Sequence, residues 1–370
     1  MSADLSIMVQ PSPSVDTQGP TILVEERGVW RKTIPTTGSS VSILALRRDF
    51  NKALYAAVAN AGGVANPLAS LRLQAGNLCN ALLPKELIER LHESADGNGS
   101  APVLRIHTDE DAEWVPWEML HDGNDWLGLR FRIARLPIVA EPPSQPEDCK
   151  RPVSKVRSVL GKAVAAPPNG DFKFWRETFD DLLPAGMEPE RVPVGQDDAG
   201  WPDVDALNQE ADILHVTCHG LRAPESGPYW TLDPDRPQAF YAYSLMASQL
   251  SGMASRLGRR HPLVFGNACS PGGADLPDDA EKPPLATAFF RSGVLNFVGT
   301  LAPIRKALAL RFARMFYESL LGDGVPVADA LLAAKQRCAA DDEKKTDPTY
   351  LLYCLYGPPE TRYVPQGGDG

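Results

Sequence analysis

Two reactive side chains, those of His219 and Cys269, lie where apolar and β-branched runs give way to glycine and proline. The runs are residues 213–220 and 263–273, and each has the length and composition of a buried strand. A thiolate is a good nucleophile for a carbonyl carbon, and an imidazole exchanges protons near neutral pH. The pair therefore indicates cysteine-dependent acyl transfer, such as peptide-bond hydrolysis.

Glycines accompany both reactive residues. Gly220 follows His219 directly, and Gly272 and Gly273 come shortly after Cys269. Glycine permits tight turns and lets a substrate backbone approach closely. Backbone N–H groups exposed at such turns can hold a developing oxyanion, which is a large contribution to acyl-transfer catalysis.

The elements predicted around these residues place them at one edge of a sheet. Strand and helix alternate along the second half of the chain, which favours a mostly parallel sheet covered by helices on both faces. Sites in open α/β sheets form at the carboxyl ends of the strands. We therefore expect His219 and Cys269 to face a common cleft.

The motifs resemble those of the CHAT family, the caspase-like peptidases of the caspase/separase clan. Cys218-His219-Gly220 matches the histidine motif, and Asn267-Ala268-Cys269-Ser270 matches the cysteine motif. The separation of 50 residues (269 − 219) agrees with the caspase spacing of about 50. Ser270-Pro271-Gly272 departs from the small residue plus glycine that usually follows the cysteine. The similarity runs from about residue 71 to 359 and includes three flanking signatures: residues 116–120 (PWEML), 290–294 (FRSGV) and 356–358 (YGP).

The resemblance implies a caspase-like catalytic domain at residues 151–365 and a smaller N-terminal α/β domain at 21–150 that lacks the dyad. The proline-rich segment 141–152 is the predicted boundary, and residues 1–20 are predicted to be a disordered leader. In this reading Cys269 is the nucleophile and His219 the general acid/base. The backbone N–H groups of Gly220 and Cys269 would form the oxyanion hole.

The resemblance also implies a regulated endopeptidase that cleaves a specific partner protein once an activating partner has acted. In bacteria such peptidases occur in antiviral and other defence systems and in programmed cell death, where gasdermin-like pore formers are among the substrates. The alternatives are a catalytically silent CHAT scaffold and a different Cys/His hydrolase or acyl transferase on an α/β sheet. Retention of both His219 and Cys269 favours the peptidase.

Specificity is left open by the residues. Asp233 and Asp275 are the two candidates for an acidic pocket, although Asp233 precedes a proline and a simple turn is the favoured interpretation there. The acidic loop 275–281 could select a basic substrate, bind calcium or be merely solvated. Arg222 could instead bind an acidic residue.

Composition excludes several partners. The net charge is −10 and the pI about 5.2, without a dense lysine/arginine stripe, so no direct contact with nucleic acid is expected. No apolar stretch is long enough to span a bilayer, and the start lacks a signal-peptide pattern, so we expect a cytoplasmic protein. The six cysteines are scattered without zinc-binding spacing, and we expect no cofactor, no metal site and mostly buried thiols.

Local patterns predict the remaining elements. His215 is expected to be a buried, hydrogen-bonded histidine on the same side of the sheet as His219, with Cys218 on the opposite face. Trp117 is assigned to the core, Glu118 to a helix cap, and His261 to the surface. Besides the two strands already named, strands are expected at 21–24, 42–48, 103–107, 131–136, 156–164, 191–194 and 294–300. Helices are expected at 71–94 (divided at Pro84), 172–183, 243–257, 285–291, 306–321 and 327–340.

Overall fold

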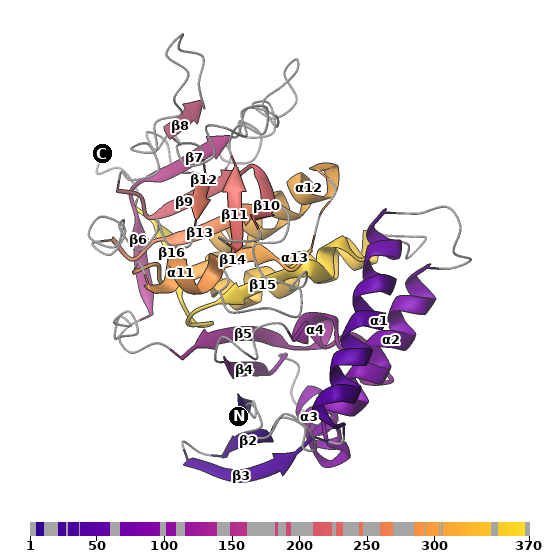
Figure 1. Cartoon of the computed structure of the whole chain (residues 1–370). Coiled ribbons are helices and arrows are strands. Elements are labelled where there is room, and N and C mark those ends of the chain that lie inside the picture. Colours follow the sequence, from indigo (N-terminus) through magenta and orange to yellow (C-terminus); the bar gives the residue numbers. More distant parts are fainter. Residues whose placement is uncertain are drawn as a thin grey trace.

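The computed structural model (Figure 1) describes residues 5–10, 21–26, 29–36, 38–59, 67–96, 101–108, 115–138, 149–160, 182–183, 190–193, 210–223, 227–231, 244–246, 260–268, 285–291, 293–302, 304, 306–341 and 347–366. Eleven of the described strands form one sheet, in the order β3-β2-β1-β4-β5-β15-β14-β13-β9-β7-β8. Neighbouring strands are parallel except at the pairs β1–β2, β2–β3 and β14–β15. The predicted mostly parallel sheet is confirmed.

The strands of the large sheet come from both halves of the chain. In sequence order they are β1 (Leu5–Gln10), β2 (Thr21–Glu26), β3 (Val29–Pro35), β4 (Val103–Thr108), β5 (Arg132–Pro137), β7 (Val156–Leu160), β8 (Glu190–Pro193), β9 (Ile213–Thr217), β13 (Leu263–Asn267), β14 (Asn296–Thr300) and β15 (Tyr353–Tyr356). Two smaller sheets contain β10 (His219–Ala223), β11 (Gly227–Thr231) and β12 (Ser244–Met246), and β6 (Lys150–Val153) with β16 (Arg362–Pro365).

Helices cover both faces of the sheet. They are α1 (Ser40–Ala59), α2 (Pro67–Leu82), α3 (Lys85–Asp96), α4 (Leu127–Arg130), α11 (Leu285–Arg291), α12 (Lys306–Tyr317) and α13 (Val327–Asp341), with 3-10 turns at Trp117–Met119 and Thr349–Leu352 and a π-helical turn at Glu318–Gly322. Along β9 and β13, successive side chains enter two different core clusters. One cluster contains buried residues of α1, α2, α3 and α11, and the other contains buried residues of α12 and α13. The two groups of helices therefore lie on opposite faces, as alternation along a strand requires.

The two halves meet in the middle of the sheet. Strand β15, from the end of the chain, pairs in parallel with β5 of the first half at Tyr356 and Arg135. The predicted domain boundary at 141–152 follows β5 and ends within β6, and residues 141–148 of it are outside the described residues. The sheet therefore continues across the two predicted domains (Figure 1).

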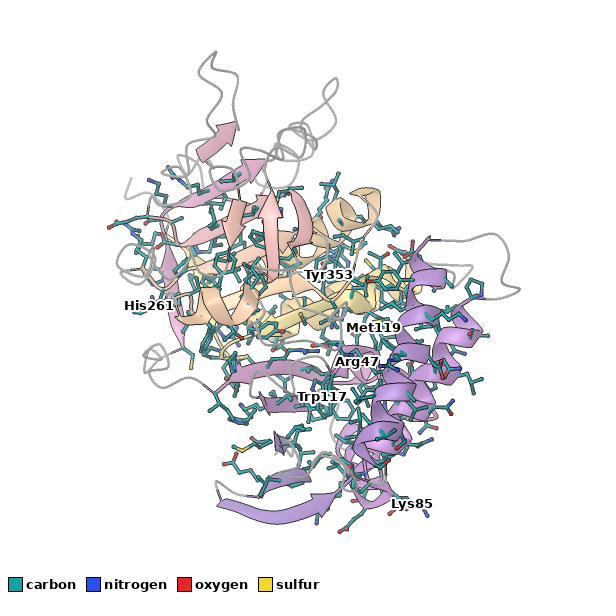
Figure 2. The ribbon with its side chains drawn as sticks, in the orientation of Figure 1. Arg47, Lys85, Trp117, Met119, His261 and Tyr353 are labelled. Carbon is teal, nitrogen blue, oxygen red and sulfur yellow. The ribbon has the colours of Figure 1, made fainter. Side chains whose placement is uncertain are left out.

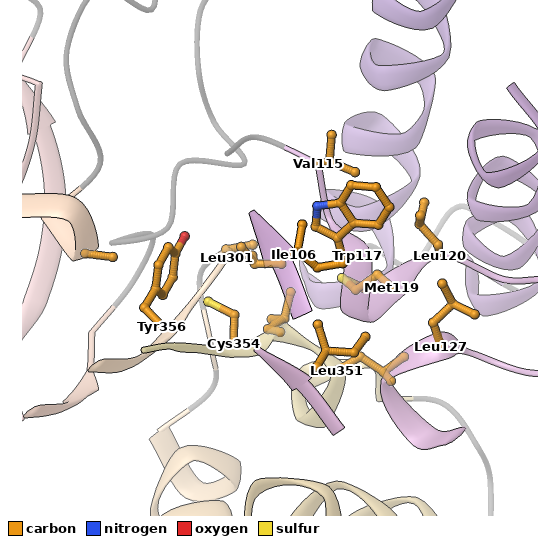
Figure 3. Close-up of a cluster of buried hydrophobic side chains, with 14 of the residues drawn as sticks. Ile106, Val115, Trp117, Met119, Leu120, Leu127, Leu301, Leu351, Cys354 and Tyr356 are labelled. Carbon is orange, nitrogen blue, oxygen red and sulfur yellow. The ribbon is translucent and has the colours of Figure 1, made fainter. Parts of the chain in front are cut away.

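A buried ion pair lies at this junction. Glu118 and Arg135 are both inaccessible to solvent, and two contacts join them: Nε to Oε1 at 3.1 Å and Nη2 to Oε2 at 2.5 Å. Trp117 and Met119, on either side of Glu118, enter the apolar cluster that also contains Cys354 and Tyr356 (Figure 3). Trp117 is thus a core residue as predicted. The prediction that Glu118 is a helix cap is wrong, because its carboxylate is paired with the Arg135 guanidinium.

The first half contains two further differences from the predicted elements. Residues 42–48 were predicted as a strand but belong to α1. The apolar run fits a strand over seven residues, but burial continues at helical spacing through Ile43, Phe50, Leu54 and Ala57. The helix is also capped at its start, where the Ser39 hydroxyl accepts a hydrogen bond from the Ser42 N–H at 3.3 Å.

The predicted disordered leader contains a strand of the large sheet. Strand β1 pairs with β2 and with β4, and its alternate residues Ile7 and Val9 are buried. The surrounding serines and prolines suggested disorder, but this short alternating segment buries one face. Residues 1–4 and 11–20 lie outside the described residues.

Most other elements occur where the sequence predicted them. The helical stretch 71–94 is divided at Pro84 into α2 and α3, and α11, α12 and α13 begin at the predicted residues. Within the predicted helix 243–257, residues 244–246 form strand β12 instead, and the rest lies outside the described residues. Residues 172–181 of the predicted helix 172–183 also lie outside them.

Candidate active site

The ends of β9 and β13 lie side by side at the centre of the second half of the sheet. The two strands are parallel, with Thr217 aligned with Asn267, and the Cys218 N–H donates to the Asn267 carbonyl at 3.3 Å. Each candidate catalytic residue comes two positions after this aligned pair. The backbone of His219 opens strand β10, while its side chain and the whole of Cys269 lie outside the described residues.

A small antiparallel sheet begins at His219. Strand β10 pairs with β11, with His219 opposite Thr231 and Gly220 opposite Trp230, and β11 pairs with β12. The Trp230 indole is fully buried and packs on Phe289 and Phe297, with ring centroids 5.2 and 6.0 Å apart. The hairpin therefore holds the backbone of His219 against the α11 face of the large sheet.

Close packing of this indole requires glycine in the strand that leads to Cys269. A Cβ at Gly266 would lie 2.4 Å from Trp230 Cζ2, whereas a Cβ at Gly76 in α2 would lie no nearer than 3.8 Å to its first neighbour. Neither glycine needs a positive φ angle. Gly266 thus allows the hairpin to seat against β13.

We expect Gly266→Ala to destabilise the fold by about 1–3 kcal/mol, because added atoms in a packed core force neighbours to move. The matched variant Gly76→Ala should be neutral or stabilising by up to about 1 kcal/mol, since alanine favours a helix interior. Urea denaturation of both variants measures the difference. Equal stability of Gly266→Ala and the wild type would show that the indole does not pack against this strand.

A buried polar network lies on the opposite, α12–α13 face of the same two strands. His215 is inaccessible to solvent, and its Nδ1 and Nε2 lie 3.1 Å from Tyr317 Oη and Thr217 Oγ1. Its ring stacks on Phe265 with a centroid separation of 5.0 Å. Burial lowers the pKa of His215 well below its usual value. The predicted buried, hydrogen-bonded histidine is confirmed, and Cys218 is buried in the cluster on the opposite face as expected.

The same network holds Asn267, the last residue of β13. The Asn267 Nδ2 lies 3.4 Å from both the Ala309 carbonyl and His215 Nε2, and the Tyr353 hydroxyl donates to Asn267 Oδ1 at 2.7 Å. The Thr300 hydroxyl donates to the carbonyl of Ala268 at 2.6 Å. The chain is therefore fixed by side chains from β14, β15 and β9 up to the residue before Cys269.

The other predicted site residues have mixed positions. Gly220 is partly exposed in β10, where its backbone pairs with that of Trp230. Asp233, Asp275 and the acidic loop 275–281 lie outside the described residues. Figure 2 places His261 far from Tyr353. His261 is half-buried rather than on the surface, because its Nδ1 lies 3.0 Å from the Gly293 carbonyl.

Sequence reasoning missed the roles of Tyr353, Thr300 and Tyr317. Asn267 was recognised only as part of the cysteine motif. A signal was present, because Asn267 and Thr300 interrupt apolar strands at their carboxyl ends, where buried polar groups need partners. The sequence did not indicate which tyrosine on which distant element supplies the partner.

In the part of the chain that the structure describes, no group of three or more His, Cys, Asp or Glu side chains is arranged to hold a metal ion. Similarly, none of the helices in that part is long and apolar enough to cross a bilayer. The five cysteines described carry free thiols, and Cys79, Cys218 and Cys354 are buried.

The arrangement of sheet and strands is similar to that of solved cysteine proteases. The Arg-specific cysteine proteinase gingipain R aligns with a TM-score of 0.52 and 12% identity, over 76% of this chain and 68% of its own. The pro- and mature domains of Porphyromonas gingivalis RgpB align with a TM-score of 0.52 and 11% identity, over 77% and 71%. Saccharomyces cerevisiae separase, in its complex with securin, aligns with a TM-score of 0.55 and 10% identity. This alignment covers 96% of the present chain and 30% of the separase chain. The fold is therefore that of the caspase-like cysteine peptidases.

The sequence places the chain within one family of this class. The CHAT domain matches residues 72–358, most of the chain, so the protein belongs to the CHAT domain family. This match confirms the resemblance inferred from the motifs. No curated protein shows a significant match to the sequence.

Proposed function

We propose that this protein is a cysteine endopeptidase in which Cys269 attacks the scissile carbonyl and His219 acts as general acid/base. The observation that carries the proposal is the register of β9 and β13, which aligns Thr217 with Asn267. Each reactive residue comes two positions beyond an aligned residue. Because side chains alternate along strands, His215 and Thr217 fall on one side of β9, as do Phe265 and Asn267 on β13. His215 and Phe265, which stack, show that the two sets share the same face.

The proposed reaction follows from thiol and imidazole chemistry. Removal of the Cys269 proton by the imidazole gives a thiolate, which adds to the peptide carbonyl and forms a tetrahedral oxyanion. Protonation of the leaving amine by His219 releases the first product and leaves an acyl-enzyme, which water then hydrolyses. The backbone N–H groups of Gly220 and Cys269 are the proposed donors to the oxyanion.

Two histidines occur in this stretch, and burial separates their roles. His215 has hydrogen-bond partners at both ring nitrogens and no access to solvent. Its lowered pKa keeps it neutral near pH 7, so it cannot deliver a proton to a substrate outside the core. His219 lies beyond the end of the strand, next to the partly exposed Gly220. The proposal therefore assigns proton transfer to His219.

The proposed substrate is a partner protein, cleaved at a limited number of sites after activation by another protein. A bacterial defence role with a gasdermin-like pore former as substrate is the expectation that follows from the family. Gingipain R is Arg-specific, and an acidic pocket at Asp233 or Asp275 would give this chain a similar preference for a basic residue. We propose this basic preference as the one to test first.

A cleavage screen tests the proposed activity. The full chain, the Cys269→Ala variant and the wild type treated with a thiol alkylator are incubated with a peptide library that varies the residue before the scissile bond. We expect only the untreated wild type to cleave the peptides, because the acyl-enzyme cannot form without the thiol. We also expect it to prefer Lys or Arg before the scissile bond. Cleavage after Asp would reject Asp233 and Asp275 as pocket residues. Cleavage that persists in Cys269→Ala would reject the proposed function.

A further inference from the structure

The structure assigns a positioning role to Asn267, His215, Tyr353 and Thr300, which together form a buried clamp that fixes the chain leading into Cys269 and His219. This inference rests on the proposed function, because it concerns the placement of the two proposed catalytic residues. None of the four clamp residues is a catalytic residue itself, since all are enclosed in the core behind the strand ends.

The clamp joins the two strand ends side by side. Within β9, His215 Nε2 contacts the hydroxyl of Thr217, two residues further along the strand. The Asn267 amide of β13 lies 3.4 Å from the same His215 Nε2. The main chain adds the bond from the Cys218 N–H to the Asn267 carbonyl. A displacement of either strand end would therefore break bonds to the other.

Two further elements anchor the cysteine side of the clamp. The Tyr353 hydroxyl, from the antiparallel strand β15, donates to Asn267 Oδ1 at 2.7 Å, and Thr300 of β14 donates to the Ala268 carbonyl at 2.6 Å. Asn267 is 4% exposed and Tyr353 is inaccessible. Buried hydrogen bonds of this kind specify one backbone position, because each donor or acceptor left unpaired carries a desolvation cost.

The neutral state of His215 is part of the clamp. The Ala309 carbonyl can only accept, so the Asn267 group that faces it is the N–H₂, and this same group points at His215 Nε2. Nε2 must therefore accept, which places the ring proton on Nδ1, where it is donated to Tyr317 Oη at 3.1 Å. A protonated ring would present an N–H to the amide and break this contact. Deep burial on the α12–α13 face keeps the ring neutral.

A second Tyr–Asn pair in the same fold provides a matched control. The hydroxyl of Tyr363 donates to Asn296 Oδ1 at 3.0 Å, and the Asn296 amide donates to a backbone carbonyl, that of Pro358, at 2.9 Å. Both residues are as buried as Asn267 and Tyr353. However, Asn296 begins β14, whereas Asn267 ends β13, and Asn296 is aligned with the first residue of β13. The two pairs have the same chemistry at opposite ends of the strands.

The test compares Tyr353→Phe with Tyr363→Phe in the full chain. Each variant loses one buried hydroxyl and keeps its ring, so we expect similar losses of stability. Tyr353→Phe, but not Tyr363→Phe, should lower kcat by between about tenfold and a hundredfold with little change in KM. Small displacements of reacting groups reduce reaction rates by factors of this size. Thr300→Val, which removes the bond to the Ala268 carbonyl, should behave like Tyr353→Phe.

A second readout does not depend on finding a substrate. The rate of Cys269 alkylation by iodoacetamide is followed against pH by peptide mass spectrometry. In Tyr353→Phe and Thr300→Val the apparent thiol pKa should rise from the wild-type value towards about 8.5, that of a free thiol, because the thiolate no longer lies in place beside the imidazole that stabilises it. In Tyr363→Phe it should remain at the wild-type value.

The outcomes separate the inference from the function on which it rests. If Tyr353→Phe and Tyr363→Phe give the same kcat and the same Cys269 titration, while Cys269→Ala is inactive, the clamp is overturned and the proposed function stands. If Cys269→Ala keeps activity, or wild-type Cys269 titrates like a free thiol, the proposed function falls and takes the clamp with it.

Discussion

His219→Ala is expected to reduce kcat by about 10²–10⁴-fold, the usual contribution of a positioned general acid/base. The substitution removes the group that deprotonates the thiol and protonates the leaving amine. It should also abolish the limb of the pH–rate profile that reports the imidazole. The fold should persist, because the backbone of His219 keeps its pairing with Thr231 in β10–β11. Steady-state kinetics on the peptide cleaved best by the wild type, from pH 5 to 9, measure both effects.

A second histidine serves as the control for His219→Ala. His261 lies before the first residue of β13, at the opposite end of the strand from Asn267, and its φ angle is 46°. Asparagine tolerates this left-handed conformation better than most residues, so His261→Asn preserves the backbone while removing the imidazole. It should retain wild-type kcat and pH dependence. An equal loss in both variants would show that the effect of His219→Ala is structural.

The largest stability loss is expected for Glu118→Gln. Burial alone would lower the pKa of Arg135, but the charge of Glu118, its hydrogen bond to the guanidinium and smaller contributions from Tyr356 and Cys354 together raise that pKa. Loss of the carboxylate therefore leaves a charged guanidinium in the core, at a cost of about 3–5 kcal/mol. The fully buried Lys335 adds to this cost. Burial lowers its pKa to about 8, and Glu118 is the main charge that opposes this shift. Urea denaturation at pH 7 measures the free energy of unfolding.

Two variants show whether burial is the cause. Glu318→Gln removes a carboxylate that pairs with Arg314 at 2.9 Å and Arg337 at 2.8 Å on the surface, where each pair is worth at most about 1 kcal/mol. Glu318→Gln should leave the midpoint of urea denaturation nearly unchanged. Replacing both buried partners, in Glu118→Leu/Arg135→Met, should recover most of the loss, because no guanidinium is then left unpaired in the core. A mild effect of Glu118→Gln, comparable to that of Glu318→Gln, would contradict the account of the junction.

The sequence predicted the elements whose evidence is local and repeated. Helices α11 to α13 show apolar residues at helical spacing over several turns, and the strands before His219 and Cys269 are continuous apolar runs bounded by glycine and proline. The strand predicted at 42–48 was wrong because a seven-residue apolar window does not distinguish the two periods. Strand β1 was missed because its evidence is pairing with β2 and β4, which are distant in the chain.

The sequence allowed reactive residues to be proposed for the candidate site, but it gave little indication of the contacts that support them. The motifs around His219 and Cys269 could be recognised because each residue follows a strand. The hairpin β10–β11 and its dependence on Gly266 could not be predicted, since the contact joins Trp230 to a backbone 36 residues later (266 − 230). The same holds for the Tyr353 hydroxyl, which comes from the end of the chain. Such contacts depend on tertiary packing, which local pattern does not contain.

The most direct test of the proposed dyad is the site at which a thiol-reactive peptidyl probe attaches. The wild-type chain, with any activating partner present, is treated with a peptidyl acyloxymethyl ketone carrying Lys or Arg, and the adduct is located by peptide mass spectrometry. We predict one modified residue, Cys269, and a labelling rate that falls sharply in His219→Ala. Attachment at another cysteine, or equal labelling of Cys269 with and without the His219 imidazole, would contradict the assignment.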